Sequence, residues 1–111
     1  MRDHALDNIL TWAEVLDKTI AASIFDFTGA DRHIRMRELL DTRRQLIIVA
    51  KVARSVKNSN LSSLVDKVRS DMDEYVEVPK DKPTEEKRQE LRRSIMKLIN
   101  MVIEIKYSQL E

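Results

Sequence analysis

Residues 32–57 read RHIRMRELLDTRRQLIIVAKVARSVK, and they combine the longest apolar run of the chain, LIIVA at residues 46–50, with its densest basic cluster. Apolar residues recur here at steps of three and four, which is the period of an α-helix. The stretch contains neither Gly nor Pro, the residues that most often interrupt a helix. The pattern therefore predicts one long helix over residues 31–57, with Asp31 as its N-cap.

The apolar residues of this helix cover an unusually wide arc. The inward face is predicted to carry Leu39, Leu46, Val49, Ala53 and Val56, and a sideways extension carries Met36, Leu40, Ile47 and Ala50. Such an arc is wider than packing on two neighbours requires. It indicates that a third helix or a partner chain covers the remainder.

Three further helices are expected over residues 4–25, 61–77 and 84–109, each with an apolar stripe at helical spacing. The stripes comprise Leu6, Ile9, Leu10, Ala13, Leu16, Ile20 and Ile24, then Leu61, Leu64, Val65, Val68, Met72, Tyr75 and Val76, then Leu91, Ile95, Leu98, Val102 and Ile105. Met96, Ile99 and Ile103 add a second stripe to the last helix, which is therefore also expected to be buried on more than one side. Breaks are predicted at residues 26–31, 58–60 and 78–83, where the only Gly, an Asn-Ser-Asn turn and both Pro occur.

A thinner stripe on the first helix carries Trp12, Val15 and Ala22. Two interpretations are open at this point. The stripe faces another subunit, or Trp12 covers the edge of the core.

The whole chain, residues 1–111, is expected to form one all-α domain, because 111 residues suit a single modest core. One Gly and two Pro leave few turns. A connection as short as residues 58–60 forces the flanking helices to lie antiparallel. The sequence thus predicts an antiparallel up-down-up-down four-helix bundle, and the alternative is two long hairpins that pair only on dimerisation.

The chain has no Cys, which excludes disulfides and thiolate metal sites and fits a reducing compartment. No apolar run approaches the roughly 18 residues of a membrane span. The N-terminus leads into an acidic amphipathic segment rather than a signal peptide. We therefore expect a cytoplasmic protein without a membrane partner.

Charged residues make up 35% of the chain, yet the net charge is +1. By segment the net charge alternates: −3 over residues 1–30, +5 over 31–57, −3 over 58–79 and +2 over 80–111. Neighbouring helices of a bundle would then carry opposite signs, and ion pairs across helix borders explain the pattern in one interpretation. In the other, the cations of residues 31–57 stay free to bind a partner.

Arg37, Arg44 and Lys51 are spaced by seven residues, so they line up along one side of a helix. Arginine forks onto phosphate through two donors, and a row of cations on a rigid helix suits a nucleic-acid backbone. The candidate nucleic-acid-binding residues are Arg32, Arg37, Arg43, Arg44, Lys51, Arg54 and Lys57. A basic group at the start of the last helix, namely Lys87, Arg88, Arg92 and Arg93, is expected to extend this surface.

Recognisable catalytic and metal motifs are missing from the sequence. His4 and His33 are the only histidines, and neither a Glu-x-x-His nor a His-Glu-x-x-His motif occurs. Two His without Cys cannot build a standard zinc site, and nothing in the spacing of Ser23, Asp26 and His33 recommends them as a triad. We therefore expect a non-enzymatic protein with no metal or cofactor.

Several stretches resemble a family of small helical bundles, the ribosomal-RNA intervening-sequence proteins and the accessory proteins of diversity-generating retroelements. The likeness rests on an aromatic turn before a basic helix start (Phe25, Phe27, Arg32 and Arg35), on AKVAR at residues 50–54, and on the short turn into Leu61, Leu64 and Val65. The Gly-rich, Trp-bearing end of that family's last helix has no counterpart in residues 96–107. The resemblance implies a non-catalytic bundle that forms a ring-like homo-oligomer, with a basic surface for nucleic acid and a polymerase partner.

The first functional hypothesis is a non-catalytic, self-associating bundle that binds nucleic acid through the basic helix as an accessory to a larger complex. The alternative is a protein–protein adaptor or structural assembly subunit with no nucleic-acid role. An enzyme with an unrecognised site is the third. The direction in which Arg37, Arg44 and Lys51 point, to solvent or to acidic neighbours, is the observation that separates the first two.

Overall fold

The computed structural model of the chain describes residues 2–22, 31–77 and 84–110, and these form helices joined in one place by a short turn, with no strand. The helices are α1 (Arg2–Ala22), α2 (Asp31–Ser55), α3 (Ser59–Glu77) and α4 (Thr84–Leu110). The predicted all-α fold with four helices is confirmed for this part of the chain. The end of the expected first helix, residues 23–25, lies outside the described residues, as do Phe27 and Gly29.

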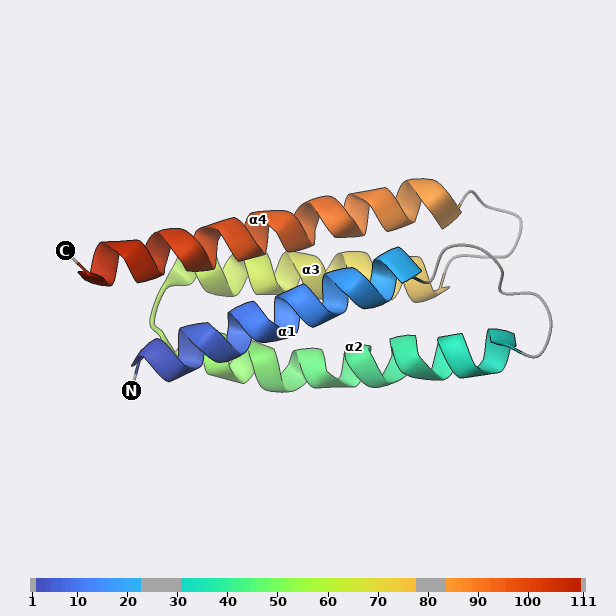
Figure 1. The fold of residues 1–111 in the computed structure, drawn as a ribbon, viewed down its shortest axis with the longest axis horizontal. Helices are drawn as coiled ribbons and strands as arrows, with labels where there is room; N and C mark the ends of the chain where they lie inside the picture. Colours follow the sequence, from blue (N-terminus) through green and yellow to red (C-terminus); the bar gives the residue numbers. More distant parts are fainter. Residues whose placement is uncertain (1, 23–30, 78–83, 111) are drawn as a thin grey trace.

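The four helices occupy the corners of an elongated bundle that measures 50 × 21 × 18 Å. Each helix packs on two others in cyclic order, α1 on α2, α2 on α3, α3 on α4 and α4 on α1. Across the diagonals, the backbones of the described parts of α2 and α4 stay apart, and so do those of α1 and α3. Figure 1 shows α2 and α4 on opposite sides of the molecule, and α1 begins at the same end where α4 finishes.

A single apolar core fills the space between the helices. It is built from the predicted stripes: Leu6, Ile9, Ala13, Leu16 and Ile20 of α1, Leu46, Val49, Ala50 and Ala53 of α2, Leu61, Val65, Val68, Met72 and Tyr75 of α3, and Leu91, Ile95, Leu98 and Val102 of α4. Each fully buried Leu or Ile stabilises the fold by roughly 1.5–3 kcal/mol relative to an exposed one. None of the described helices has the length and apolarity needed to cross a membrane.

The turn between α2 and α3 differs from its predicted form in detail. α2 ends at Ser55 rather than at Lys57, and the amides of Val56 and Lys57 donate to carbonyls three residues back. Lys57 then adopts a φ of 59°, the left-handed conformation in which helices commonly terminate. Asn58 accepts a hydrogen bond from the Leu61 amide at 3.1 Å through its side chain, so it is the N-cap from which α3 starts two residues earlier than expected.

The predicted second apolar strips of α2 and α4 are covered in part, since Ala50 is buried and Ile99 packs partly buried against the core. Ile47 and Ile48 of α2 are exposed, and so are Met96 and Ile103 of α4. In a four-cornered bundle a helix meets its two neighbours and the core, so the arc beyond them faces solvent. Part of the apolar arc that was expected to meet a third helix therefore remains uncovered.

Trp12 packs partly buried against the core, and its indole Nε1 is buried without a hydrogen-bond partner among the described residues. Val15, from the same thin stripe, is 56% exposed. Trp12 thus lies at the edge of the core instead of presenting an open aromatic surface.

Candidate nucleic-acid interface

Arg37, Arg44 and Lys51 lie on the outward face of α2, and all three side chains are exposed. Leu46 and Ala53 are fully buried on the same helix. Two residues correspond to about 200° around a helix axis, so Arg44 and Lys51 point away from the core that Leu46 and Ala53 enter. The row therefore faces solvent rather than the acidic helices α1 and α3.

The cations of this face meet little opposing charge among the described residues. Lys51 and Arg54 are exposed and pair with no carboxylate among the described residues. Arg44 is 81% exposed, and among the described residues it meets only Asp41 of its own helix, at 3.9 Å. An exposed pair of this kind contributes between nothing and about 1 kcal/mol, so Arg44 can leave Asp41 for a stronger anionic partner.

Two of the predicted site residues, Arg43 and Lys57, do not lie on this row. Arg43 is half-buried, and its Nη1 lies 3.7 Å from Asp73 Oδ1 of α3, so it belongs to the contact between α2 and α3. Lys57 is exposed but follows the end of α2, where the chain has already turned. The side chain of Arg32 lies outside the described residues.

Three of the four residues of the expected extension onto α4 serve contacts inside the bundle. Lys87 Nζ lies 3.2 Å from Glu74 of α3, and Arg92 Nε donates to Asp17 of α1 at 3.0 Å. Arg88 is buried. Only Arg93, the last of the four, is exposed without a partner among the described residues.

The ion pairs of α4 perturb the titration of the groups that form them. The hydrogen bond with Glu74, and then the charges of Glu74 and Glu90, raise the pKa of Lys87 above its ordinary value. The hydrogen bond with Asp17, together with its charge, raises the pKa of Arg92. Both cations are therefore held charged by carboxylates of neighbouring side chains.

Arg88 shows why a basic residue occupies the core side of α4. Its Nε and Nη2 donate to the Glu85 carboxylate at 2.9 and 2.7 Å, and its Nη1 donates to the Ala21 carbonyl at 3.3 Å. Ala21 lies in the last turn of α1, where carbonyls lack helical partners. The hydrogen bonds from Arg88, and then Gln89, lower the pKa of Glu85, so Arg88 ties α4 to the end of α1.

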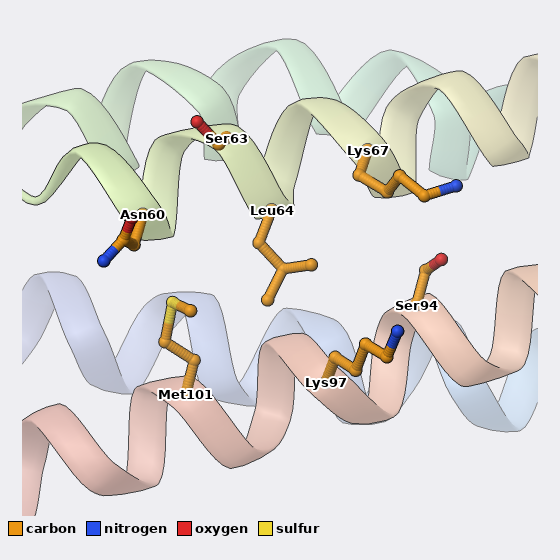
Figure 2. Close-up of a pocket in the computed structure, with 7 residues that line it drawn as sticks. All are labelled: Asn60, Ser63, Leu64, Lys67, Ser94, Lys97 and Met101. Atoms are coloured by element: carbon orange, nitrogen blue, oxygen red, sulfur yellow. The ribbon is translucent and has the colours of Figure 1, made fainter.

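A groove of about 390 Å³ runs between α3 and α4. Figure 2 shows Leu64 and Met101 at its centre, and Lys67, Ser94 and Lys97 toward one end. Lys67 donates to both carboxylate oxygens of the buried Asp71, at 3.1 and 3.2 Å, and Ser94 donates to the same carboxylate. Ser94 and Asp71 thus join α4 to α3 at this end of the groove, and Lys67 is held by Asp71 of its own helix.

The described residues contain no group of three or more His, Asp, Glu or Cys side chains placed to hold a metal ion. The groove between α3 and α4 and the outward face of α2 remain the main surfaces with distinctive chemistry. Of the two, only the face of α2 presents several cations without strong partners.

Exposed aliphatic side chains interrupt the basic face of α2. The prediction from charge alone did not include them. Ile48 is 64% exposed and Ile47 is 47% exposed, and they lie in sequence between Arg44 and Lys51. The signal was available in the sequence, because Ile48 is two residues from the buried Leu46 and so falls on the opposite side of the helix. The outward face of α2 therefore combines cations with a small apolar surface.

No protein-family model matches the chain, and neither a curated protein nor a solved structure matches it.

Proposed function

We propose that the protein is a non-catalytic, self-associating helical bundle that binds the backbone of a nucleic acid through the outward face of α2, as an accessory to a larger complex. The observation that carries the proposal is the exposed row Arg37, Arg44 and Lys51, with Arg54 beside it. The absence of Cys suits a reducing compartment such as the cytoplasm.

The spacing of the row suits an extended polyanion. Seven residues of helix rise by about 10 Å, so Arg37, Arg44 and Lys51 span roughly 20 Å on one rigid element. Phosphates recur along nucleic acid at intervals of a few Å, and each one neutralised releases condensed counterions. Such a row recognises the charge of the backbone and carries no means of reading bases, so binding is expected to be independent of sequence.

The proposal includes an antiparallel up-down-up-down order of the helices. Its support is the register of contacts: Asp7 and Asp17 of α1 pair with Lys106 and Arg92 of α4, in reverse order. On the other side of α4, Asp71 and Glu74 of α3 meet Ser94 and Lys87, again in reverse order. In this arrangement α2 lies diagonal to α4.

Binding to a short duplex, followed by fluorescence anisotropy across a salt series, tests the proposal. The double variant Arg37→Glu/Arg44→Glu is expected to bind at least about tenfold more weakly at low salt, and to lower the slope of log K against log salt by about two. The matched control Lys18→Glu/Arg69→Glu makes the same change in net charge with exposed residues of α1 and α3. It is expected to keep most of the affinity.

No binding at low salt, or equal losses for the two double variants, would count against the proposal. Equal losses would mean that total charge, rather than the face of α2, determines binding. Far-UV circular dichroism of each variant checks that the helices are intact.

A second candidate, a protein-binding adaptor, is favoured by one observation: Ile47 and Ile48 stand exposed between Arg44 and Lys51. Cations around an apolar centre suit an acidic amphipathic helix. Ile48→Ser separates the candidates, because a backbone contact with nucleic acid is expected to survive it unchanged. Light scattering with and without a mixed RNA and DNA pool provides the second readout, since an adaptor would show no change in mass.

A further inference from the structure

The outward face of α4 carries apolar side chains that the described part of the chain leaves partly exposed. Met96 is 46% exposed, Ile103 36% and Tyr107 67%. Together with the exposed Asn100 they are spaced by four, three and four residues, which is the spacing of a coiled-coil seam. This face is directed away from α2, because α4 packs on α1 and α3 and α2 lies diagonally across the bundle (Figure 1).

Two unused charges of opposite sign flank the seam. Lys97 and Glu104 are exposed, and neither charged group pairs with another described residue. Neither has an oppositely charged residue three or four positions away on the helix, so the usual intrahelical pairing does not account for them. By contrast, Lys87, Arg92 and Lys106, on the flanks of the same helix, each pair with a carboxylate.

We propose that this face of α4 binds the same face of a second copy of the chain in antiparallel orientation, which rests on the self-association in the proposed function. A two-fold axis between Asn100 and Ile103 would set Met96 against Tyr107 of the second copy. It would also bring Lys97 beside Glu104 of the second copy. Because a two-fold axis repeats every contact, two ion pairs and two sulfur–aromatic contacts form together.

The charges select this arrangement over the others that the chain offers. A parallel pairing through α4 would place Lys97 and Glu104 of the two copies on opposite edges of the contact, so neither would meet an opposite charge there. An antiparallel pairing through Ile47 and Ile48 of α2 would place Arg44 near Lys51 of the second copy. Like charges oppose the pairing through α2, whereas the antiparallel contact through α4 joins opposite charges.

This arrangement has a consequence for nucleic-acid binding. α2 and α4 occupy opposite corners, so two bundles joined through α4 carry their basic faces on the far sides of the dimer. The dimer then presents two separate surfaces for nucleic acid. A polyanion that reaches both would be held more tightly than by one bundle.

Charge reversal tested by sedimentation equilibrium addresses the contact directly. Lys97→Glu alone and Glu104→Lys alone each place like charges in both ion pairs, and each is expected to weaken the dimer by about tenfold to a hundredfold. An equimolar mixture of the two variants restores opposite charges in both pairs. The mixture is therefore expected to form a heterodimer as stable as the wild-type dimer, and so is the homodimer of Lys97→Glu/Glu104→Lys.

The matched control is Lys51→Glu, the same reversal on the opposite corner of the bundle, which is expected to leave dimerisation unchanged. Ile103→Asp provides a second disruption within the seam, and circular dichroism checks that each variant is helical. An oligomer that neither charge reversal weakens, or a mixture that does not recover, would overturn the contact through α4 and leave nucleic-acid binding standing.

A wild-type chain that is monomeric throughout the micromolar range would overturn this contact and the proposed self-association together. The affinity of the Lys97→Glu variant for a short duplex, measured on the monomer, separates the two proposals. It is expected to match that of the wild-type monomer, because Lys97 does not lie on α2.

Discussion

Lys87, Arg92 and Lys106 of α4 reach sideways to carboxylates of α3 and α1, whereas Arg44 and Lys51 of α2 stand on the side away from the bundle. The two helices are both basic and both rich in apolar residues, yet the cations of one hold the fold together and those of the other face solvent. Net charge per helix does not distinguish these cases. The angle of each cation relative to the buried stripe does.

The outward faces of the two helices also differ. On α4 the unpaired charges have both signs, with Lys97 and Glu104 beside exposed Met96 and Tyr107. On α2 the row is cationic. A mixed face is self-complementary and a cationic face is not, which is why we assign the first to a second copy and the second to a polyanion.

The largest effect on stability is expected from a substitution in the core. The same substitution, Ile to Ala, is compared at a buried position of α4 and at an exposed position of α2. Ile95→Ala on α4 removes a fully buried side chain and is expected to lower the free energy of unfolding by about 2–5 kcal/mol. Ile48→Ala on α2, at an exposed position, is expected to change it by less than about 0.5 kcal/mol. Urea denaturation measures both, and similar losses for the two variants would mean that Ile48 is covered in solution.

An intermediate effect is expected when a cation is removed from each helix. Arg92→Ala breaks the contact with Asp17 between α4 and α1 and is expected to cost about 1 kcal/mol of unfolding free energy. Arg44→Ala should cost less than about 0.5 kcal/mol, because its partner Asp41 lies at 3.9 Å on an exposed surface. Urea denaturation measures both variants. A larger loss of unfolding free energy for Arg44→Ala than for Arg92→Ala would contradict this difference between the two helices.

A smaller effect, of opposite sign, is expected at the end of α2. Lys57 holds a φ of 59°, a conformation that costs a residue with a Cβ about 1 kcal/mol and glycine almost nothing. Lys57→Gly is therefore expected to raise the unfolding free energy by a few tenths to about 1 kcal/mol. If thermal denaturation shows that Lys57→Gly is less stable than the wild type, then contacts of the Lys57 side chain stabilise the fold by more than its backbone conformation costs.

The smallest expected effect concerns pH. Arg88 and Gln89 lower the pKa of Glu85 in the folded chain, so this carboxylate contributes stability above the ordinary pKa of a glutamate. The contribution is lost as the pH falls through the lowered value. Glu85→Gln is expected to flatten the acid side of the stability curve slightly, and a curve as steep as that of the wild type would exclude the contribution.

Much of the fold follows from periodicity in the sequence. The stripes of α1 and α3 are buried as predicted, because a three- and four-residue repeat leaves one face apolar. The residues at which the helices end are harder to predict from periodicity. The helix α2 ends at Ser55 because the chain turns at Lys57, and no glycine marks this turn. Neither the composition nor the spacing of apolar residues predicts that Lys57 adopts a positive φ.

The candidate site was predicted in part. Arg37, Arg44 and Lys51 could be placed on one side of α2 by their spacing, but whether acidic neighbours reach them depends on packing between helices. The burial of Arg88 had a signal, because it lies three residues before Leu91 and seven before Ile95, on the core side of α4. A prediction from net charge alone placed Arg88 among the exposed cations, because it ignored the position of Arg88 relative to the apolar stripe.

The most direct test of the face of α2 is a titration of the isotope-labelled protein with a short duplex, followed by two-dimensional ¹⁵N–¹H NMR at low salt. Amide shifts are expected to concentrate along α2 around Arg37, Arg44 and Lys51, to vanish at high salt, and to leave residues 87–106 of α4 near their free positions. Shifts centred on α4, or none at low salt, would contradict the assignment of α2 as the nucleic-acid surface.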